Sequence, residues 1–217
     1  MLARLAALAM RQLAFSVLTD YSGPMANKLV RTQSTSHLAW LDLEMTGLDA
    51  QRDVILQAAL VITDKDLTPL EEYGCVIWQP ESELQKMTPF VREMHERTGL
   101  TERVRASNLD LGAAEQQLLE RVAGWCTFGA TLCGNSVGHD RRFVDRYMPG
   151  LARYLGYRII DVSSIKLLAK LWYGDAAAFE KPRAGAHDAV VDIRRSIAEL
   201  QHYRATLFRP AGGAPGA

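Results

Sequence analysis

The sequence predicts an α/β domain in which a mixed sheet is flanked by helices. Three apolar, strand-like segments follow one another within residues 38–78, and short connections between such segments are typical of an antiparallel meander. Beyond residue 108, helical segments alternate with short strands, and this alternation produces parallel strands joined by right-handed crossovers. The expected sheet therefore has five strands, of which the first three form the meander and the others are parallel.

The strands of the meander are predicted from their apolar runs and from the turns between them. The first strand opens with the apolar run from Leu38 to Leu41 and ends in a turn at Gly47. The second is the segment 54–63, and the third covers residues 73–78 after a turn at 67–69. These connections are too short to contain crossover helices, which is why neighbouring strands should run antiparallel.

The later elements are predicted from helical spacing and from the residues that start and stop helices. Leu111, Ala114, Leu118 and Val122 recur at the interval of one buried helix face. Asp161 is a typical N-cap residue for the helix that follows it. The expected elements are a helix at 109–126, a strand at 131–133, a helix at 141–148, a strand at 157–160, and helices at 161–172 and 188–207.

Composition favours a globular protein without a general affinity for nucleic acid. The chain has 217 residues, 48% of them hydrophobic, and its 25 basic residues balance 25 acidic ones. Proteins that coat long nucleic acids usually carry a basic field, so a phosphate-bearing ligand should be short or held in a local pocket. Cys75, Cys126 and Cys133 fit neither a disulfide framework nor a zinc motif, which favours a reducing compartment.

The two ends of the chain differ from its middle. We expect a leader and linker at residues 1–36, one domain at 37–208 and a disordered tail at 209–217. The leader contains Arg4 and Arg11 but no acid before residue 20, so it is either an import signal or an over-extended, disordered start. Its apolar runs are too often interrupted to span a membrane, and no membrane partner is expected. The expected location is the cytoplasm, or the mitochondrion if the leader directs import.

Two acids at the end of the first strand are the first candidates for chemistry. Asp42 and Glu44 are two residues apart, so their side chains point to the same face of the sheet. Two neighbouring carboxylates that lose water repel each other, and a divalent cation such as Mg²⁺ would offset that repulsion. The alternative is that one carboxylate caps the turn and the other is solvated.

Two further segments carry acids that should reach the same edge of the sheet. Asp140 follows the fourth strand, and Asp192 lies in the first turn of the last helix, with His187 in the loop before it. Together with Asp42 and Glu44, these acids would hold two divalent ions that clamp the attacking and leaving oxygens of a phosphodiester hydrolysis. A neutral histidine in this position would take the proton of the attacking water.

Each of these later residues also has an ordinary structural interpretation. Asp140 could serve only as an N-cap, His187 could be a loop histidine without a role, and Asp192 could be a solvated helix acid. The metal hypothesis depends on all three segments occurring together and in this order.

Several motifs resemble the oligoribonuclease family. The matching stretches are Leu41 to Asp49 (LDLEMTGLD), Cys133 to Ser136 with Asp140, Tyr157 to Ser163 (YRIIDVS) and His187 with Asp192, and the resemblance covers about residues 38–208. That family belongs to the DEDDh class of 3′-to-5′ exonucleases with a ribonuclease H-like fold. The resemblance implies that Asp42, Glu44, Asp140 and Asp192 bind two Mg²⁺ or Mn²⁺ ions and that His187 is the general base.

The resemblance also implies a substrate-binding set and a homodimer. In the family a leucine and an aromatic residue pinch the terminal bases, and Leu48 and Phe90 match them, although Phe90 could instead pack in the core. A tyrosine at the position of Tyr157 completes the site of the neighbouring subunit. The residues that match the binding site for the phosphate at the far end of the substrate are Ser136, Arg158 and Ser163.

The implied activity is 3′-to-5′ hydrolysis of short RNA, chiefly dinucleotides, to nucleoside 5′-monophosphates. One alternative is a DNA exonuclease of the same class, which would need an open groove for a longer strand. Another is a catalytically weak nucleotide-binding protein, and the departure that favours it is Gln57, where relatives usually have Glu. Gln keeps the hydrogen-bonding capacity but loses the charge, so metal affinity could differ from that of relatives.

Overall fold

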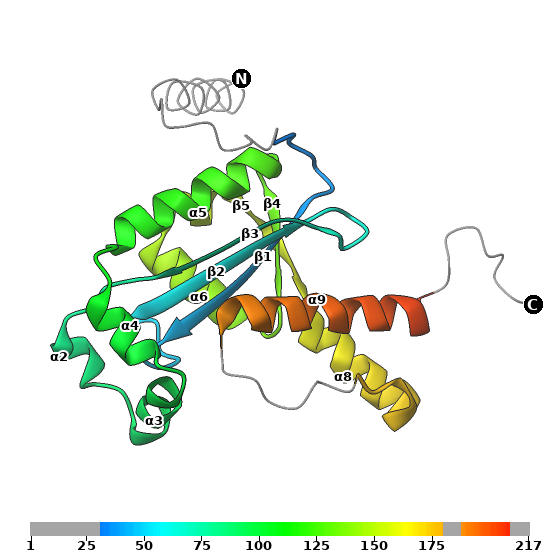
Figure 1. Ribbon diagram of the computed structural model, residues 1–217. Helices are drawn as coiled ribbons and strands as arrows, with labels where there is room; N and C mark the ends of the chain where they lie inside the picture. Colours follow the sequence, from blue (N-terminus) through cyan, green and yellow to red (C-terminus); the bar gives the residue numbers. More distant parts are fainter. Residues whose placement is uncertain (1–30, 180–187, 209–217) are drawn as a thin grey trace, which may run out of the picture. The chain divides into compact units, whose positions relative to one another are not determined.

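The computed structural model describes residues 31–179 and 188–208, and these contain a five-stranded mixed sheet. The strand order is β3-β2-β1-β4-β5, so β1 is central and β3 and β5 form the edges (Figure 1). β2 is antiparallel to β1 and β3, whereas β4 runs parallel to β1 and β5. The predicted α/β class, the meander and the parallel strands are therefore confirmed. The strands are β1 (Leu38–Met45), β2 (Ile55–Thr63), β3 (Pro69–Val76), β4 (Ala130–Gly134) and β5 (Leu155–Asp161).

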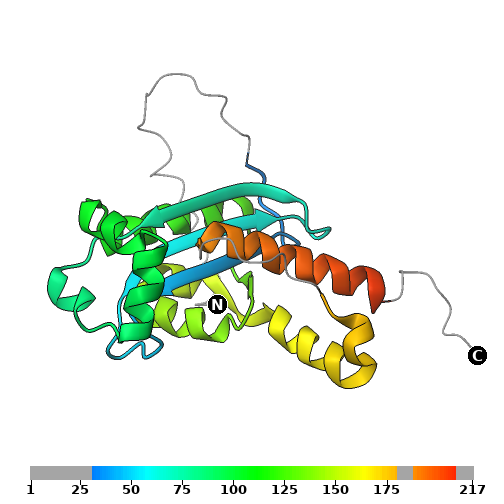
Figure 2. The ribbon, with the colours of Figure 1, turned by 60° about the horizontal axis from the view of Figure 1, so that its bottom comes forward.

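Helices cover both faces of this sheet, because its central strands are apolar on both sides. The helices α5 (Leu111–Trp125), α6 (Gly138–Tyr147) and α7 (Pro149–Tyr154) pack on one face. The other face is covered by α8 (Val162–Tyr173) and α9 (Ala189–Thr206), which contact each other (Figures 1 and 2). A 3₁₀ turn at Gly174–Ala177 follows α8.

The pattern of apolar residues explains this arrangement. Leu41 and Leu43 alternate with Trp40 along β1, so the first two enter the core under α5 and the third enters the core under α9. Leu118 and Val122, two members of the predicted helix stripe, are buried against that first face. β1 is therefore held from both sides, which fixes the strand that carries the first two acids.

The region between β3 and α5 differs from the prediction. It contains three short helices that were not predicted, α2 (Glu81–Leu84), α3 (Pro89–Arg97) and α4 (Leu100–Ala106). They are too short for a clear helical period, and their apolar residues form a small core of their own with Leu56 of β2. β3 also begins earlier than expected, at Pro69, because an edge strand tolerates proline and alternating polar residues.

Two smaller differences concern helix boundaries. The helix predicted at 141–148 begins at Gly138, so Asp140 lies inside its first turn rather than before it. α7, just before β5, was not predicted.

The cysteines agree with the prediction, since Cys75, Cys126 and Cys133 are all free and buried. Among the described residues, no helix is both long and apolar enough to cross a membrane. The predicted boundaries at residues 36 and 208 remain predictions. The leader up to residue 30 and the tail from 209 lie outside the described residues.

Candidate active site

The site begins at the carboxyl end of β1, where Asp42 and Glu44 share the face covered by α9. Asp42 lies opposite Ala59 and Glu44 lies opposite Gln57 in the antiparallel register with β2. The turn that follows is tight: a Cβ at Gly47 would lie 2.4 Å from an oxygen of Asp53. Only glycine fits there without displacing Asp53, so the family motif around Gly47 has a local structural cause.

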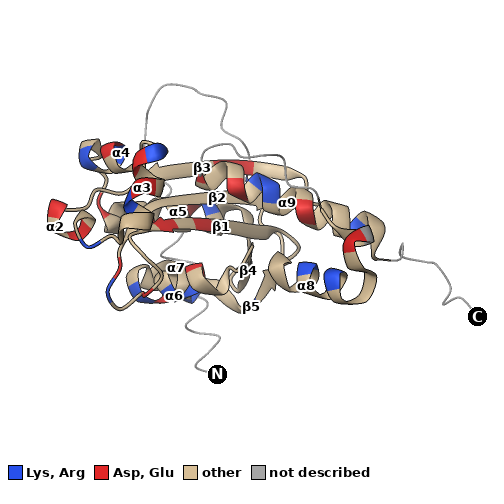
Figure 3. Cartoon of the chain, turned by 90° about the horizontal axis from the view of Figure 1, so that it is seen from below, with Lys and Arg blue, Asp and Glu red and all other residues tan. Residues whose placement is uncertain are grey.

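The N-terminus of α9 brings a third carboxylate to this edge. Asp188 caps the helix, since its Oδ1 accepts hydrogen bonds from the backbone N–H groups of Val190 and Val191. One turn later, Asp192 offers an oxygen that lies within 4.8 Å of oxygens of both Asp42 and Glu44. Figure 3 shows that both β1 and α9 carry acidic residues, drawn in red. The expectation that acids 150 residues apart in the sequence converge is met for these three.

Asp140 reaches the same end of β1 from helix α6. It lies in the first turn of α6, is only 6% exposed, and its Oδ1 accepts a hydrogen bond of 3.0 Å from the backbone N–H of Leu43. Leu43 is the residue between Asp42 and Glu44. The interpretation of Asp140 as an N-cap is therefore wrong. The N-cap residue of α6 is Val137, whose side chain makes no capping hydrogen bond.

Burial and mutual repulsion raise the pKa values of these acids. Burial, followed by the charge of Asp140, raises the pKa of Asp42 well above its usual range. Burial, followed by the charges of Asp192 and Asp140, raises the pKa of Glu44 to about 7. Burial also raises the pKa of Asp140 to about 7, although the hydrogen bond from Leu43 opposes this change. The cluster therefore carries more negative charge than its surroundings can accommodate.

The side chains present fit a hard divalent cation. Every donor in the cluster is a carboxylate oxygen, which Mg²⁺ and Mn²⁺ prefer, and a cation would lower the raised pKa values. Gln57 supplies independent support. Its side chain is buried on the same face as Glu44, and its Oε1 has no hydrogen-bond partner among the residues that the structure describes. A buried acceptor of this kind matches a hydrated cation, whose water can donate to it.

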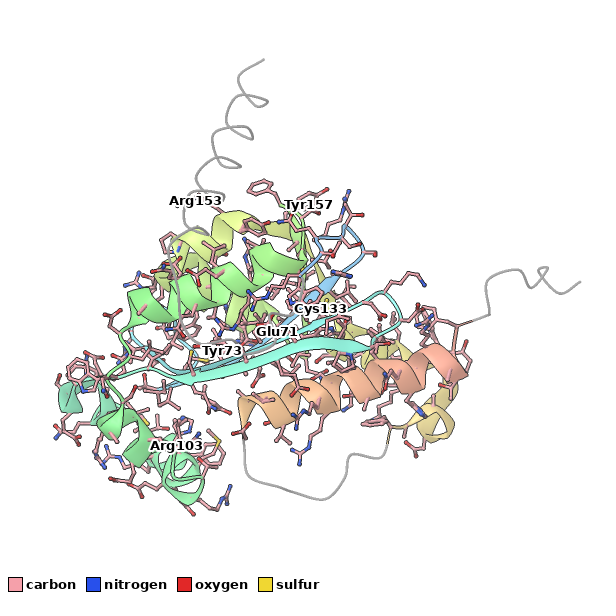
Figure 4. All side chains as sticks on the ribbon, turned by 45° about the horizontal axis from the view of Figure 1, so that its top comes forward. Glu71, Tyr73, Arg103, Cys133, Arg153 and Tyr157 are labelled. Atoms are coloured by element: carbon pink, nitrogen blue, oxygen red, sulfur yellow. The ribbon has the colours of Figure 1, made fainter. Side chains whose placement is uncertain are left out.

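Three charged residues around the cluster were not singled out from the sequence. Asp188 adds negative charge near Asp42 and Glu44, and its position as N-cap of the predicted last helix could have indicated this. Arg195 donates a hydrogen bond of 2.9 Å to Asp192. Arg103 of α4 lowers the pKa of Glu44 (Figure 4). No local sequence signal connects Arg103 with β1, because α4 itself was not predicted.

A second polar cluster lies at the carboxyl ends of β4 and β5. The hydroxyl oxygens of Ser136 and Ser163 are 3.1 Å apart, and the N–H of Ser136 donates to the Ser163 hydroxyl at 2.9 Å. Asp161 caps α8 by accepting from the N–H of Ser163, and it also accepts from the N–H of Ser136. Two of the three residues predicted to hold a phosphate are thus brought together.

The other predicted substrate-binding residues are exposed. Leu48 is 65% exposed and Phe90 is 76% exposed, so the alternative that Phe90 packs in the core is wrong. Tyr157 of the edge strand β5 is 82% exposed and lies at the surface (Figure 4). The Arg158 guanidinium lies 4.8 Å from the centre of the Tyr157 ring. His187 lies outside the described residues.

Solved structures of similar fold are exonucleases. Exonuclease I from Methylocaldum szegediense superimposes with a TM-score of 0.61 at 19% identity, covering 79% of this chain and 41% of that chain. Exonuclease I from E. coli, in complex with an oligonucleotide, gives 0.62 at 15% identity, covering 80% of this chain and 42% of that chain. The chain spans about two fifths of these proteins, and at such low identity the likeness concerns the fold.

Sequence comparison is more specific. Residues 39–200 match the RNase T exonuclease family model. The oligoribonuclease of Francisella tularensis is 45% identical over 178 residues, which is 81% of this chain and 98% of that protein. The oligoribonuclease of Ectopseudomonas mendocina is 43% identical over 175 residues, covering 79% of this chain and 96% of that protein. This chain therefore belongs to the RNase T exonuclease family and, within it, to the oligoribonucleases that its sequence motifs resemble.

Proposed function

We propose that this exonuclease hydrolyses short oligoribonucleotides from the 3′ end, chiefly dinucleotides, and releases nucleoside 5′-monophosphates. The observation that carries the proposal is the convergence of Asp42, Glu44 and Asp192 on one spot, with Asp140 bound to the backbone between the first two. The cluster would act on a phosphodiester, and the Ser136–Ser163 pair would bind the opposite end of the substrate. A substrate held at both ends has to be short.

Asp42, Glu44, Asp140 and Asp192 would hold two divalent ions, either Mg²⁺ or Mn²⁺. When bound, these ions would neutralise the charge that develops on the phosphate and orient the attacking and leaving oxygens. The carboxylates hold those ions in place only when they are ionised, and their raised pKa values favour the proton in the ions' absence.

His187 would be the general base that takes the proton of the attacking water. It directly precedes Asp188 in the sequence, and the charge of Asp188 raises the pKa of both Asp42 and Glu44. An imidazole has an unperturbed pKa near 6.5 and can accept a proton at neutral pH. A flanking carboxylate such as Asp188 would favour that transfer, because it stabilises the imidazolium that forms.

Recognition of the substrate would use the exposed residues. Leu48 and Phe90 present apolar side chains to solvent, and exposed apolar or aromatic groups of this kind stack with unpaired bases. Arg158 would supply a positive charge to the terminal phosphate beside Ser136 and Ser163. A bound 5′-terminal phosphate would then limit substrate length.

We also propose a homodimer in which Tyr157 of one copy reaches the active site of the other. β5 is an edge strand that exposes Tyr157 and Ile159, and α8 beside it exposes Leu171 and Trp172. Apolar side chains gathered on a sheet edge and the adjacent helix are typical of a protein interface. Sedimentation analysis of the wild type should give twice the mass of one chain. A purely monomeric species at micromolar concentration would contradict the dimer.

The free, buried cysteines support the proposal that the protein works in the reducing cytoplasm. The mitochondrial alternative depends on the leader. Fusing residues 1–36 to a fluorescent reporter in a eukaryotic cell distinguishes the two locations: import of the reporter would support the mitochondrion, and a diffuse cytosolic signal the cytoplasm.

A length series tests the proposed substrate. RNA and DNA oligomers of two to about ten nucleotides are incubated with and without Mg²⁺ or Mn²⁺, and mononucleotide release is measured. The proposal predicts metal-dependent release that is fastest for RNA dinucleotides and falls with length. Rates that hold or rise with length on DNA would support the DNA exonuclease instead. Binding of nucleotides without any release would support the nucleotide-binding protein.

A further inference from the structure

Glu199 is a charged residue in the middle of α9 that is completely buried and lies outside the acid cluster. A buried carboxylate is costly unless donors surround it. Glu199 has them: the Tyr203 hydroxyl donates to its Oε1 at 3.1 Å, the Asn135 side-chain amide donates to its Oε2 at 3.3 Å, and the Lys166 ammonium lies 3.4 Å from Oε1. These partners come from three different elements, so the contact is specific to the tertiary fold.

The donors remain donors at neutral pH. Burial and the neighbouring Glu199 charge raise the pKa of Tyr203 to about 12, so its hydroxyl keeps its proton. Lys166 lies partly exposed on α8. Glu199 is therefore held as an acceptor, and an acceptor-only group dictates which end of a neighbouring amide faces it.

The neighbouring amide is Asn135, which directly precedes Ser136. Its nitrogen donates to Glu199 and, at 2.7 Å, to the Ser196 hydroxyl. Because Glu199 and Ser196 both accept from this nitrogen, it faces α9, and the amide oxygen faces the other way. That oxygen accepts a hydrogen bond of 3.2 Å from the Ser163 hydroxyl. Glu199, together with Ser196, whose hydroxyl donates to the Asp192 carbonyl, thus determines where the proton of Ser163 points.

The orientation of Ser163 in turn constrains Ser136. With its proton directed at Asn135, the Ser163 oxygen presents lone pairs to the N–H of Ser136 at 2.9 Å and to its hydroxyl at 3.1 Å. Ser136 has a φ of +52°, a left-handed conformation that a non-glycine residue adopts only when its surroundings hold it. Ser136 is exposed, so its hydroxyl is the one of the pair that can rotate and donate a hydrogen bond to a bound anion.

We propose that Glu199 and Asn135 are positioning residues that preset the Ser136–Ser163 pair for the terminal phosphate of the substrate. They act through the serines and touch neither substrate nor metal. The inference rests on the proposed function, since it concerns the phosphate end of that substrate. It predicts an effect on binding of a phosphorylated substrate and no effect on the hydrolytic step, which occurs at the acid cluster.

The test compares the dinucleotide substrate with and without a 5′-phosphate. Asn135→Ala removes the link between Glu199 and Ser163, and Glu199→Gln lets the amide turn over. In both variants the KM for the phosphorylated dinucleotide should rise about 10-fold, the size expected for one lost charge-assisted hydrogen bond. kcat should stay within about twofold, because the hydrolytic site is unaltered, and the KM for the unphosphorylated dinucleotide should not change. Glu120→Gln, an exposed acid on α5, is the matched control and should leave all values unchanged.

Further measurements distinguish a failure of the positioning role from a folding defect and from a failure of the proposed function. If Glu199→Gln does not fold, Asn135→Ala decides, because it leaves Glu199 its Tyr203 and Lys166 partners. If the wild type releases no mononucleotide from any RNA, the proposed function fails and the positioning role falls with it. If the wild type is active but Asn135→Ala shows no selective rise in KM for the phosphorylated substrate, the positioning role alone is overturned.

Discussion

The two polar clusters at the carboxyl ends of the strands are built on opposite principles. At the end of β1, Asp42, Glu44 and Asp192 crowd together without enough positive charge, and their burial raises the pKa values of the first two. At the ends of β4 and β5, Ser136 and Ser163 belong to a network in which each donor has an acceptor. The acid cluster would be destabilised by its own charge in the absence of a cation. The serine cluster has its hydrogen bonds formed without any ligand.

The difference teaches what each cluster is suited to do. Repelling carboxylates store unfavourable energy that a cation relieves, so that cluster is suited to binding a metal ion, and a bound ion would raise the folding stability. A hydroxyl network whose hydrogen bonds are all formed stores no such energy, and it contributes by holding its hydroxyl groups in a fixed orientation for a ligand.

The largest effect is expected from removing one charge of the acid cluster or its proposed base. Asp42→Asn and His187→Ala should each lower turnover by at least about 10³-fold, since several kcal/mol of transition-state stabilisation depend on them. The folded structure should persist, as judged by circular dichroism. The metal-free Asn variant should even melt at a higher temperature than wild type, because one repelling charge is gone. Full turnover in either variant would refute the roles assigned to both residues.

Gln57 offers a way to add charge to the same cluster. Gln57→Glu should tighten Mn²⁺ binding by about 10-fold, the lower end of typical effects for residues that contact a metal's ligands or waters. Isothermal titration calorimetry measures the affinity directly. Gln57→Met, which keeps the volume but removes the buried acceptor, should instead weaken binding. An identical affinity in all three proteins would mean that Gln57 does not face the cation.

Stability should depend on pH in a direction set by the raised pKa values. Glu44 and Asp140 titrate near 7 in the folded protein but near 4 when unfolded, so the native state binds more protons between these values. Stability of the metal-free protein should therefore fall as pH rises from 5 to 7.5. With solvent screening of the partly exposed Glu44, the loss should be on the order of 2 kcal/mol, or roughly 4–8 °C in Tm.

Added Mg²⁺ or Mn²⁺ should restore the Tm at pH 7.5 and have little effect at pH 5, where the carboxyls are protonated. Melting curves at the two pH values, with EDTA or with metal, give the four temperatures. A metal-free protein that is more stable at pH 7.5 than at pH 5 would show that the acids do not repel one another.

The smallest effect concerns the hydroxyl cluster. Ser136→Ala should raise the KM for a 5′-phosphorylated dinucleotide by about 10-fold through loss of one hydrogen bond to an anion. Metal affinity and the pH dependence of Tm should stay as in wild type, because the acid cluster is unchanged. The control is Ser164→Ala, an exposed neighbour of Ser163 on α8, which should behave like wild type. Altered Mn²⁺ binding in Ser136→Ala would show that the two clusters are coupled.

The features that follow from local patterns could be predicted from the sequence. Strand alternation correctly predicted that Asp42 and Glu44 share a face, and the order of strands and helices predicted a mixed sheet whose carboxyl ends meet. The order of the segments also pointed to Asp140 and Asp192, and the family resemblance implied the same two residues. These predictions succeed because strand periodicity and topology are coded by residues close together in the chain.

The features that depend on distant partners could not be predicted. Asn135 and Glu199 are 64 residues apart, and nothing in the local sequence of α9 indicates that Glu199 is buried rather than solvated. The left-handed φ of Ser136 was hidden because glycine, the usual sign of this conformation, is absent. α2, α3 and α4 were missed because short helices are stabilised by packing rather than by their own period.

A crystal of the protein soaked in Mn²⁺ and measured at a wavelength where manganese scatters anomalously tests the central claim most directly. Two anomalous peaks are expected, about 3.5–4 Å apart, bounded by the carboxylates of Asp42, Glu44 and Asp192 with Asp140 alongside. The Asp42→Asn crystal, treated in the same way, should lose at least one peak. Absence of any peak at these carboxylates in the wild-type crystal would contradict the account.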